Sequence, residues 1–185
     1  AVTTALEIGY RHIDTAEMYG NEREVGEAIR RSGIPREEIF VTSKLNNGFH
    51  RPEDAERAFA DTLDALGLEQ IDLFLIHWPL PTRYDGDFVA TWRTMASFAD
   101  DGRAASVGVS NFQPAHLARI IDETGVIPAV NQVEVHPYLT NEAVRAADAG
   151  HGIATEAWSP IAQGGVLDDP VIVEVAEAHG VTPAQ

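Results

Sequence analysis

The sequence predicts an α/β fold: an incomplete (β/α)8 TIM barrel with about six of the eight strand–helix units present. Short apolar segments that read as strands alternate along the 185 residues with segments whose apolar positions recur every three or four residues, as in amphipathic helices. Several strand segments, such as 71–76, are apolar on both faces, which is typical of a parallel sheet covered on both faces. An open doubly wound sheet fits less well, because no Gly-rich phosphate-binding turn follows the first strand.

Six segments are predicted as strands. The first ends at Asp14, and the other five cover residues 39–43, 71–76, 105–109, 129–135 and 153–157. Strands that alternate with helices in this way pair in parallel through right-handed crossovers. The C-terminal ends of all six strands should therefore meet on one rim of the barrel.

Helices are predicted between and after these strands. Asn21 with Glu24 has the spacing of a capping box, which starts a helix. Pro52 suits the first position of the next helix, and Gly67 suits its end. Asn141 is a further candidate cap. The helix after Pro52 is predicted to face inward with Ala55, Phe59, Leu63 and Leu66. Apolar residues at helical spacing mark the other helices: Val25, Ala28 and Ile29, on one face; Trp92, Met95, Ala96 and Ala99; Leu117, Ile120 and Ile121; Val144 and Ala147; and, after Pro170, Val171, Val175 and Ala178.

The two ends of the sequence read as interrupted helices. Residues 1–6 look like the end of a helix, and Thr182 followed by Pro183 has the sequence of a helix start. A closed barrel of this type usually takes roughly 250 residues. We therefore expect residues 1–185 to form a single barrel domain that is truncated at both ends.

The composition disfavours several classes of protein. The formal charge of −16 disfavours nucleic acid and anionic membranes as partners. Because the chain has no cysteine, a disulfide scaffold, a thiolate metal site and a cysteine nucleophile are excluded. No apolar run is long enough to span a bilayer, and no signal peptide opens the sequence. We expect a cytoplasmic monomer.

Four polar residues stand at or just beyond strand ends: Asp14, Tyr19, Lys44 and His77. Because side chains alternate along a strand, Asp14, Lys44 and His77 fall at the last inward-facing position of their strands. Each residue alone is most simply explained as half of an ion pair, a turn residue or a loop residue. Three of them on the inward face of three successive strand ends are better explained by a shared site.

Together the four side chains have the chemistry of a proton-donor site. A tyrosine hydroxyl has an ordinary pKa of about 10, which a nearby cation lowers. Lys44 is predicted to be that cation, kept charged and aimed by Asp14. His77 is predicted to donate a hydrogen bond to a substrate oxygen and to orient it. Such a set can give a proton to a carbonyl oxygen while another group delivers hydride.

The sequence resembles the aldo-keto reductases, and most closely their bacterial 2,5-diketo-D-gluconate reductase branch. The resemblance rests on the segments GYRHIDTAEMYGNEREVGEAI, VTSKL, DLFLIHWP, SVGVSNF, PAVNQVEVHP and EAWSPIAQGG, which cover nearly the whole chain in family order. It implies NADPH-dependent reduction of a small aldehyde, ketone or keto-sugar to an alcohol. Tyr19 would be the general acid, and Lys44 and Asp14 its charge partners. His77 would orient the carbonyl.

The resemblance further implies how the nicotinamide end of NADPH is held. Ser110, Asn111 and Gln132 would bind its carboxamide, since amide side chains offer both donors and acceptors. Trp158 would stack on the ring, because an indole face suits a flat ring. Asp14 would also lie at the cofactor.

Two further groups of residues follow from the same resemblance. Trp78 would form a wall of the substrate site, together with Tyr19 and His77. The residues that grip the 2′-phosphate in this family follow the last strand, beyond the end of this sequence, which therefore does not decide between NADPH and NADH. The pyrophosphate path would be lined by Ser159, Pro160, Ile161 and Gln163.

Two other interpretations remain open at the level of the sequence. His12 and the pair Glu134 and His136 also lie at strand ends, so a metal-dependent amidohydrolase barrel is an alternative, with bound zinc as its mark. In that alternative, Tyr19 would have no clear catalytic or metal-binding role. Folds of the reductase type also serve as non-catalytic cofactor-binding subunits, because a fold alone does not fix a function.

Overall fold

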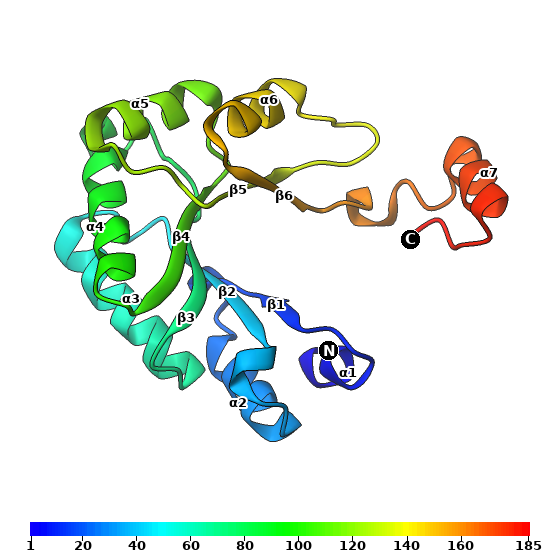
Figure 1. Ribbon diagram of the computed structural model, residues 1–185, viewed down its shortest axis with the longest axis horizontal. Helices are drawn as coiled ribbons and strands as arrows, with labels where there is room; N and C mark the ends of the chain where they lie inside the picture. Colours follow the sequence, from blue (N-terminus) through cyan, green and yellow to red (C-terminus); the bar gives the residue numbers. More distant parts are fainter.

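The computed structural model describes all 185 residues and confirms the incomplete barrel. Six strands pair in chain order, and every neighbouring pair is parallel. The sheet curls around an open concave face (Figure 1). The strand bounds agree with the predicted ones to within two residues. The strands are β1 (His12–Asp14), β2 (Phe40–Leu45), β3 (Ile71–Ile76), β4 (Ala104–Ser110), β5 (Val130–Glu134) and β6 (Ala154–Trp158).

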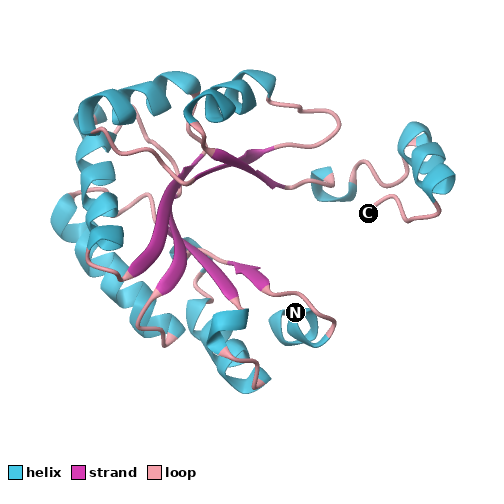
Figure 2. Ribbon diagram, viewed as in Figure 1, coloured by secondary structure: helices cyan, strands magenta, loops and turns pink.

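Seven α-helices accompany the strands. They are α1 (Val2–Glu7), α2 (Glu22–Ser32), α3 (Pro52–Leu66), α4 (Phe88–Asp100), α5 (Pro114–Thr124), α6 (Glu142–His151) and α7 (Pro170–His179). Helices α2 to α6 cover the convex face of the sheet, whereas α7 stands away from it after a long connection (Figure 2). None of the helices combines the length and the apolar character needed to cross a bilayer.

The hydrophobic core lies between the convex face of the sheet and these helices. Phe74 of β3 packs on Phe59 of α3, with the two ring centroids 4.5 Å apart, and Phe59 stacks on Phe98 of α4 at 4.2 Å. Trp92 of α4 is fully buried in the same cluster. Because side chains alternate along each strand, burying one face here turns the next residues of the strands, such as Lys44, toward the concave side.

The predicted capping box at Asn21 is wrong. Asn21 stands at the N-cap of α2, but its side chain caps no backbone N–H. Its Oδ1 instead accepts a hydrogen bond from the Thr15 hydroxyl at 2.7 Å. Because Thr15 follows β1 directly and Asn21 precedes α2, this bond closes the base of the loop that carries Tyr19.

Other predicted helix ends are partly correct. Gly67 ends α3 in the left-handed conformation, with φ of 67°, as its position predicts. Asn141 occupies the N-cap position of α6 with a left-handed backbone, φ of 50°, and its side chain caps no N–H. Its Nδ2 donates to the Glu134 carbonyl at 3.1 Å. The helix predicted at residues 1–6 is present as α1, whereas Thr182 to Gln185 form a turn and not the start of a helix.

The helix predicted after Pro170 is present as α7, but its apolar positions are largely exposed. Val171 and Val175 are 65% and 52% exposed, Ala178 is exposed, and the buried residue of this helix is Ala176. Apolar spacing shows that a helix has an apolar face, but it does not show which element covers that face. Here α7 does not reach the convex face of the sheet (Figure 1).

Gly26 allows α2 and α3 to touch. A Cβ added at this position would lie 2.2 Å from the Leu66 carbonyl oxygen, which no atom tolerates. We expect Gly26→Ala to lower the free energy of unfolding by ~2 kcal/mol, because the backbone of α3 has to move.

Gly150 of α6 is the matched control, because a Cβ added there meets nothing within 4 Å. Gly150→Ala should raise the free energy of unfolding by about 0.5–1 kcal/mol through helix propensity alone. Urea unfolding of both variants is the measurement, and effects of the same sign and size would contradict a close helix contact at Gly26.

Candidate active site

The structure brings the four predicted residues together at the C-terminal rim of the sheet. Asp14 ends β1, Lys44 is the last residue but one of β2, and His77 directly follows β3. Tyr19 ends a short 3-10 helix, Glu17–Tyr19, in the loop after β1. The parallel register sets Lys44 opposite Leu75, two residues before His77, so these side chains share the concave face.

A pocket of about 460 Å³ opens at this rim. Ten of the thirteen residues predicted for the site line it. Of the other three, Lys44 lies buried beside Asp14, while Ile161 and Gln163 lie outside the lining. The lining consists of Asp14, Tyr19, His77, Trp78, Ser110, Asn111, Gln132, Glu156, Ala157, Trp158, Ser159 and Pro160.

Lys44 is a buried cation with one ionic partner. The residue is 1% exposed, and its Nζ donates to Asp14 Oδ1 at 2.5 Å and to the Thr15 carbonyl at 2.9 Å. A buried ammonium needs such partners, because unpaired burial of a charge is costly. The predicted Asp14–Lys44 pair is therefore present, and Asp14 holds the lysine at the base of the Tyr19 loop.

Tyr19 lies over this pair. Lys44 Nζ is 5.5 Å from the centroid of its ring, and the His77 ring meets it edge-on with the centroids 5.9 Å apart. Partial burial, and then the charge of Asp14, raise the pKa of Tyr19 above its ordinary value. The expectation that the pKa of Tyr19 is lowered is wrong for this structure, because burial of the phenol and the nearby Asp14 carboxylate outweigh the Lys44 ammonium. Tyr19 is thus kept protonated.

His77 is a buried, uncharged imidazole. It is 7% exposed, and burial, followed by the charge of Lys44, lowers its pKa to about 4. Its Nδ1 is buried without a hydrogen-bond partner. A neutral imidazole retains one N–H donor, so His77 can give one hydrogen bond to an oxygen atom in the pocket.

Burial of His77 and of His50 predicts a specific loss of stability in acid. His50 is 2% exposed beneath the Tyr84 ring, and burial lowers its pKa to about 4 as well. Both groups bind protons more readily in the unfolded chain, whose histidine pKa is about 6.5. Their contribution to stability is therefore complete above pH ~6.5 and is lost as the pH falls toward about 4, on the order of 3 kcal/mol for each.

His50→Gln tests this loss of stability in acid. The free energy of unfolding of the variant is measured by urea unfolding between pH 7 and 4. The variant should lose about half of the histidine-linked part of the pH dependence. A slope of unfolding free energy against pH identical to that of the unmodified protein would contradict the buried, neutral state of His50.

Asn111 connects three other pocket residues, His77, Ser110 and Trp158, through hydrogen bonds of its side chain. It adopts a left-handed backbone with φ of 64° just after β4. Its Oδ1 accepts from the Trp158 indole N–H at 3.0 Å, and its Nδ2 donates to the His77 carbonyl at 3.0 Å and to Ser110 Oγ at 3.1 Å. Ser110 Oγ in turn donates to the Gln132 carbonyl at 2.8 Å. Both ends of the Asn111 amide are therefore already in use.

Glu156 is a pocket residue that the sequence analysis missed. Its Oε1 accepts from Gln132 Nε2 at 2.8 Å, and the same nitrogen donates to Asp14 Oδ2 at 2.8 Å. The signal was available in the sequence: Glu156 lies two residues before Trp158 in β6, so the two side chains share the face that lines the pocket.

The arrangement of histidines does not support the metal-dependent hydrolase. No group of three or more histidine, aspartate or glutamate side chains is placed to hold a metal ion. His12 Nε2 is hydrogen-bonded to Thr42 Oγ1 at 2.9 Å. Glu134 and His136 pair with each other at 3.6 Å. The side chains proposed as ligands are thus engaged elsewhere.

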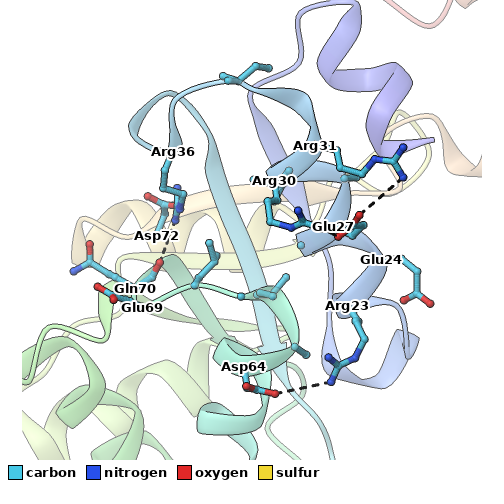
Figure 3. Close-up of a pocket in the computed structure, with 18 of the residues that line it drawn as sticks. Arg23, Glu24, Glu27, Arg30, Arg31, Arg36, Asp64, Glu69, Gln70 and Asp72 are labelled. Atoms are coloured by element: carbon cyan, nitrogen blue, oxygen red, sulfur yellow. Dashed lines mark hydrogen bonds and ion pairs between the residues drawn. The ribbon is translucent and has the colours of Figure 1, made fainter.

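A larger groove, about 1480 Å³, lies at the opposite end of the strands, between α2 and the segment that leads from α3 into β3 (Figure 3). Its arginines do not form a free cationic site for a ligand, because each of them already faces a carboxylate. The pairs are Arg23–Asp64, Arg30–Glu27, Arg31–Glu27 and Arg36–Asp72. We therefore place the functional site at the rim that carries Tyr19.

Comparison with known proteins gives one consistent family. The Aldo/keto reductase family matches the sequence over residues 1–185. An aldo-keto reductase of Mycolicibacterium smegmatis is 52% identical over 185 residues, which are 100% of this chain and 66% of that protein. Methylglyoxal reductase DkgA of Escherichia coli K12 is 47% identical over 188 residues, again 100% of this chain and 66% of that protein. The chain thus spans just under two thirds of the length of these relatives.

Solved structures agree. A mutant of Gox0644 in complex with NADPH superposes with a TM-score of 0.92 at 41% identity, covering 99% of this chain and 66% of that one. A putative 2,5-diketo-D-gluconic acid reductase B superposes with a TM-score of 0.93 at 34% identity, covering 99% of this chain and 64% of that one. The predicted resemblance, including its 2,5-diketo-D-gluconate branch, is confirmed.

Proposed function

Because this chain belongs to the aldo/keto reductase family, we propose that it reduces the carbonyl group of a small aldehyde, ketone or keto-sugar to an alcohol, with NADPH as the reductant. The observation that carries the proposal is the Lys44–Asp14 pair beneath the Tyr19 ring, with His77 at the ring edge. We further propose that residues 1–185 act as one barrel domain, in a cytoplasmic monomer.

Tyr19 is the proposed proton donor. Its raised pKa keeps the phenol protonated at neutral pH, so the proton is present before a substrate arrives. Lys44 and Asp14 are the charge partners: as the phenol gives up its proton, the ammonium 5.5 Å from the ring favours the developing phenolate. Asp14 keeps that ammonium aimed at the site.

His77 is the proposed orienting residue. As a neutral imidazole it donates one hydrogen bond to the carbonyl oxygen without competing with Tyr19 for the role of acid. Trp78 is the proposed substrate wall, because it follows His77 directly, lines the pocket and is 41% exposed. Together they would set the distance and angle between the carbonyl and the phenol.

The nicotinamide end of NADPH is proposed to bind in this pocket. Gln132 Oε1 accepts no hydrogen bond and is not among the fully buried atoms. It can therefore accept a hydrogen bond from a carboxamide N–H. Trp158 lines the same pocket, and we propose that its indole face stacks on the nicotinamide ring. Ser110 and Asn111 would join the contact by exchanging the Asn111–Trp158 hydrogen bond for one to the cofactor. When bound, the nicotinamide would supply hydride from its C4 atom to the carbonyl carbon, which balances the proton from Tyr19.

The connection after β6 is the proposed pyrophosphate path. It follows Trp158 directly, and the left-handed backbone conformations of Ser159 and Gln163 turn the chain sharply at these two positions. Ser159 and Pro160 line the pocket, and Ile161 and Gln163 continue the path away from it.

The test of the proposed function is a titration of protein fluorescence with NADPH, followed by turnover with methylglyoxal, which is chosen because a relative bears the name methylglyoxal reductase. Saturable quenching together with oxidation of NADPH that requires the carbonyl would support the proposal. Saturable binding with no turnover of any small aldehyde or ketone would favour the non-catalytic cofactor-binding subunit. No binding would refute both.

A further inference from the structure

Glu156 occupies a position that the proposed proton transfer does not use. It lies in β6, the last strand of the sheet, and shares a face with Trp158, the proposed nicotinamide platform. Its side chain is half-buried and lines the pocket. A carboxylate that is half-buried in the wall of a pocket is costly to bury and calls for a partner.

The only polar partner of this carboxylate is a neutral amide. Gln132 Nε2 donates one hydrogen to Glu156 Oε1 and the other to Asp14 Oδ2, each at 2.8 Å. Gln132 itself is 4% exposed, so its amide is a buried bridge between two carboxylates. Because both hydrogens are committed, the amide is locked with Oε1 directed away from the bridge.

The charges around the bridge do not balance. Lys44 Nζ pairs with Asp14 and cancels that carboxylate. Glu156 forms no ion pair within 4.0 Å, since every salt bridge of the molecule lies elsewhere. The pocket is therefore lined by two carboxylates, of which the ammonium behind it cancels one, and Glu156 leaves an uncompensated negative charge on the wall that includes Trp158.

We propose that Glu156 sets the redox preference of this pocket for its cofactor: its carboxylate favours the oxidised nicotinamide, whose ring is cationic, over the reduced ring, which is neutral. The inference rests on the proposed function, because it places the nicotinamide at Trp158. A fixed negative charge in a partly dehydrated pocket interacts with a ring cation and has no such interaction with a neutral ring. The same preference lowers the barrier for hydride to leave, since positive charge develops as it departs.

The experiment is a comparison of the dissociation constants of NADP+ and NADPH, measured by fluorescence titration at neutral pH and low salt. Glu156→Gln keeps the length of the side chain and an oxygen to accept from Gln132, but removes the charge. It should weaken NADP+ about tenfold and change NADPH by less than about twofold. Glu156→Asp keeps the charge and should retain the preference of the unmodified protein for NADP+ to within about threefold.

Glu134 is the matched control. It lies at the end of the neighbouring strand, is half-buried, and does not line the pocket. Glu134→Gln removes the same charge from the same end of the sheet and should leave the ratio of the two dissociation constants unchanged. A thermal unfolding midpoint for each variant shows that it is folded during the titration.

The outcomes distinguish a failure of the proposed function from a failure of the role proposed for Glu156. If the unmodified protein binds neither NADP+ nor NADPH, the proposed function and this inference both fail. If it binds both and Glu156→Gln leaves their ratio unchanged, the inference alone is overturned, and Glu156 merely holds the Gln132 amide. If Glu134→Gln shifts the ratio as much as Glu156→Gln does, the effect is one of overall charge and the inference is again overturned.

Discussion

Replacing Tyr19 with phenylalanine is expected to lower the rate of carbonyl reduction roughly a thousandfold or more, which is within the range that general acids contribute. NADPH affinity should stay within about twofold of the unmodified value, because the hydroxyl is the only group removed and the ring still covers Lys44. Turnover of methylglyoxal and a titration with NADPH are the two measurements. The loss should appear in kcat, since the missing proton matters only in the transition state.

Tyr138→Phe is the control for loss of a phenol hydroxyl. Tyr138 is 69% exposed, and its hydroxyl bonds to Asp169, which caps α7, outside the pocket. This variant should reduce methylglyoxal at the unmodified rate. Near-normal turnover by Tyr19→Phe, or an equal loss in both variants, would remove Tyr19 from the role of proton donor.

Replacing Lys44 with methionine should have the second large effect. Methionine fills the space of the alkyl stem but supplies no charge, so Asp14 keeps a carboxylate that shares the Gln132 amide with Glu156 and has no cation. Reduction should fall by about a thousandfold, because a phenolate can no longer develop beside an ammonium. The free energy of unfolding should fall by ~2 kcal/mol, less than for a fully buried pair because the Asp14 side chain is 35% exposed.

The double variant Lys44→Met, Asp14→Asn separates the two roles of the lysine. Removing both charges should restore part of the stability that Lys44→Met loses, because no uncompensated carboxylate remains. It should not restore turnover, which requires the ammonium. Recovery of activity together with stability would mean that Lys44 acts only by holding the loop in place.

Much of the site could be predicted because two regularities act together. Alternation along a strand fixes which residues face inward, and parallel pairing brings equivalent strand ends to one rim. These two rules are enough to bring Asp14, Lys44 and His77 together. The family motifs add Ser110, Asn111, Gln132 and Trp158. These four residues line one pocket with Asp14 and His77, and Lys44 lies buried behind it.

The features that sequence reasoning missed depend on contacts between elements far apart in the chain. The pKa of Tyr19 rises where a fall was expected, because burial of the phenol, and then the charge of Asp14, outweigh the effect of the Lys44 ammonium. Asn21 does not cap α2, and its Oδ1 accepts a hydrogen bond from the Thr15 hydroxyl instead. Glu156 acquires a role only through Gln132 on the neighbouring strand. No local pattern encodes which of several partners a polar side chain selects.

We propose that this rim transfers hydride from NADPH to a carbonyl carbon while Tyr19 supplies the proton. The most direct test of this proposal is incubation of the protein with methylglyoxal and NADPH that is deuterated at the transferable position of nicotinamide C4, followed by mass spectrometry of the alcohol. We expect one deuterium on the former carbonyl carbon and none on the hydroxyl oxygen, whose proton comes from Tyr19 and exchanges with water. An alcohol that carries no carbon-bound deuterium, or the absence of any alcohol in the presence of bound NADPH, would contradict the proposal.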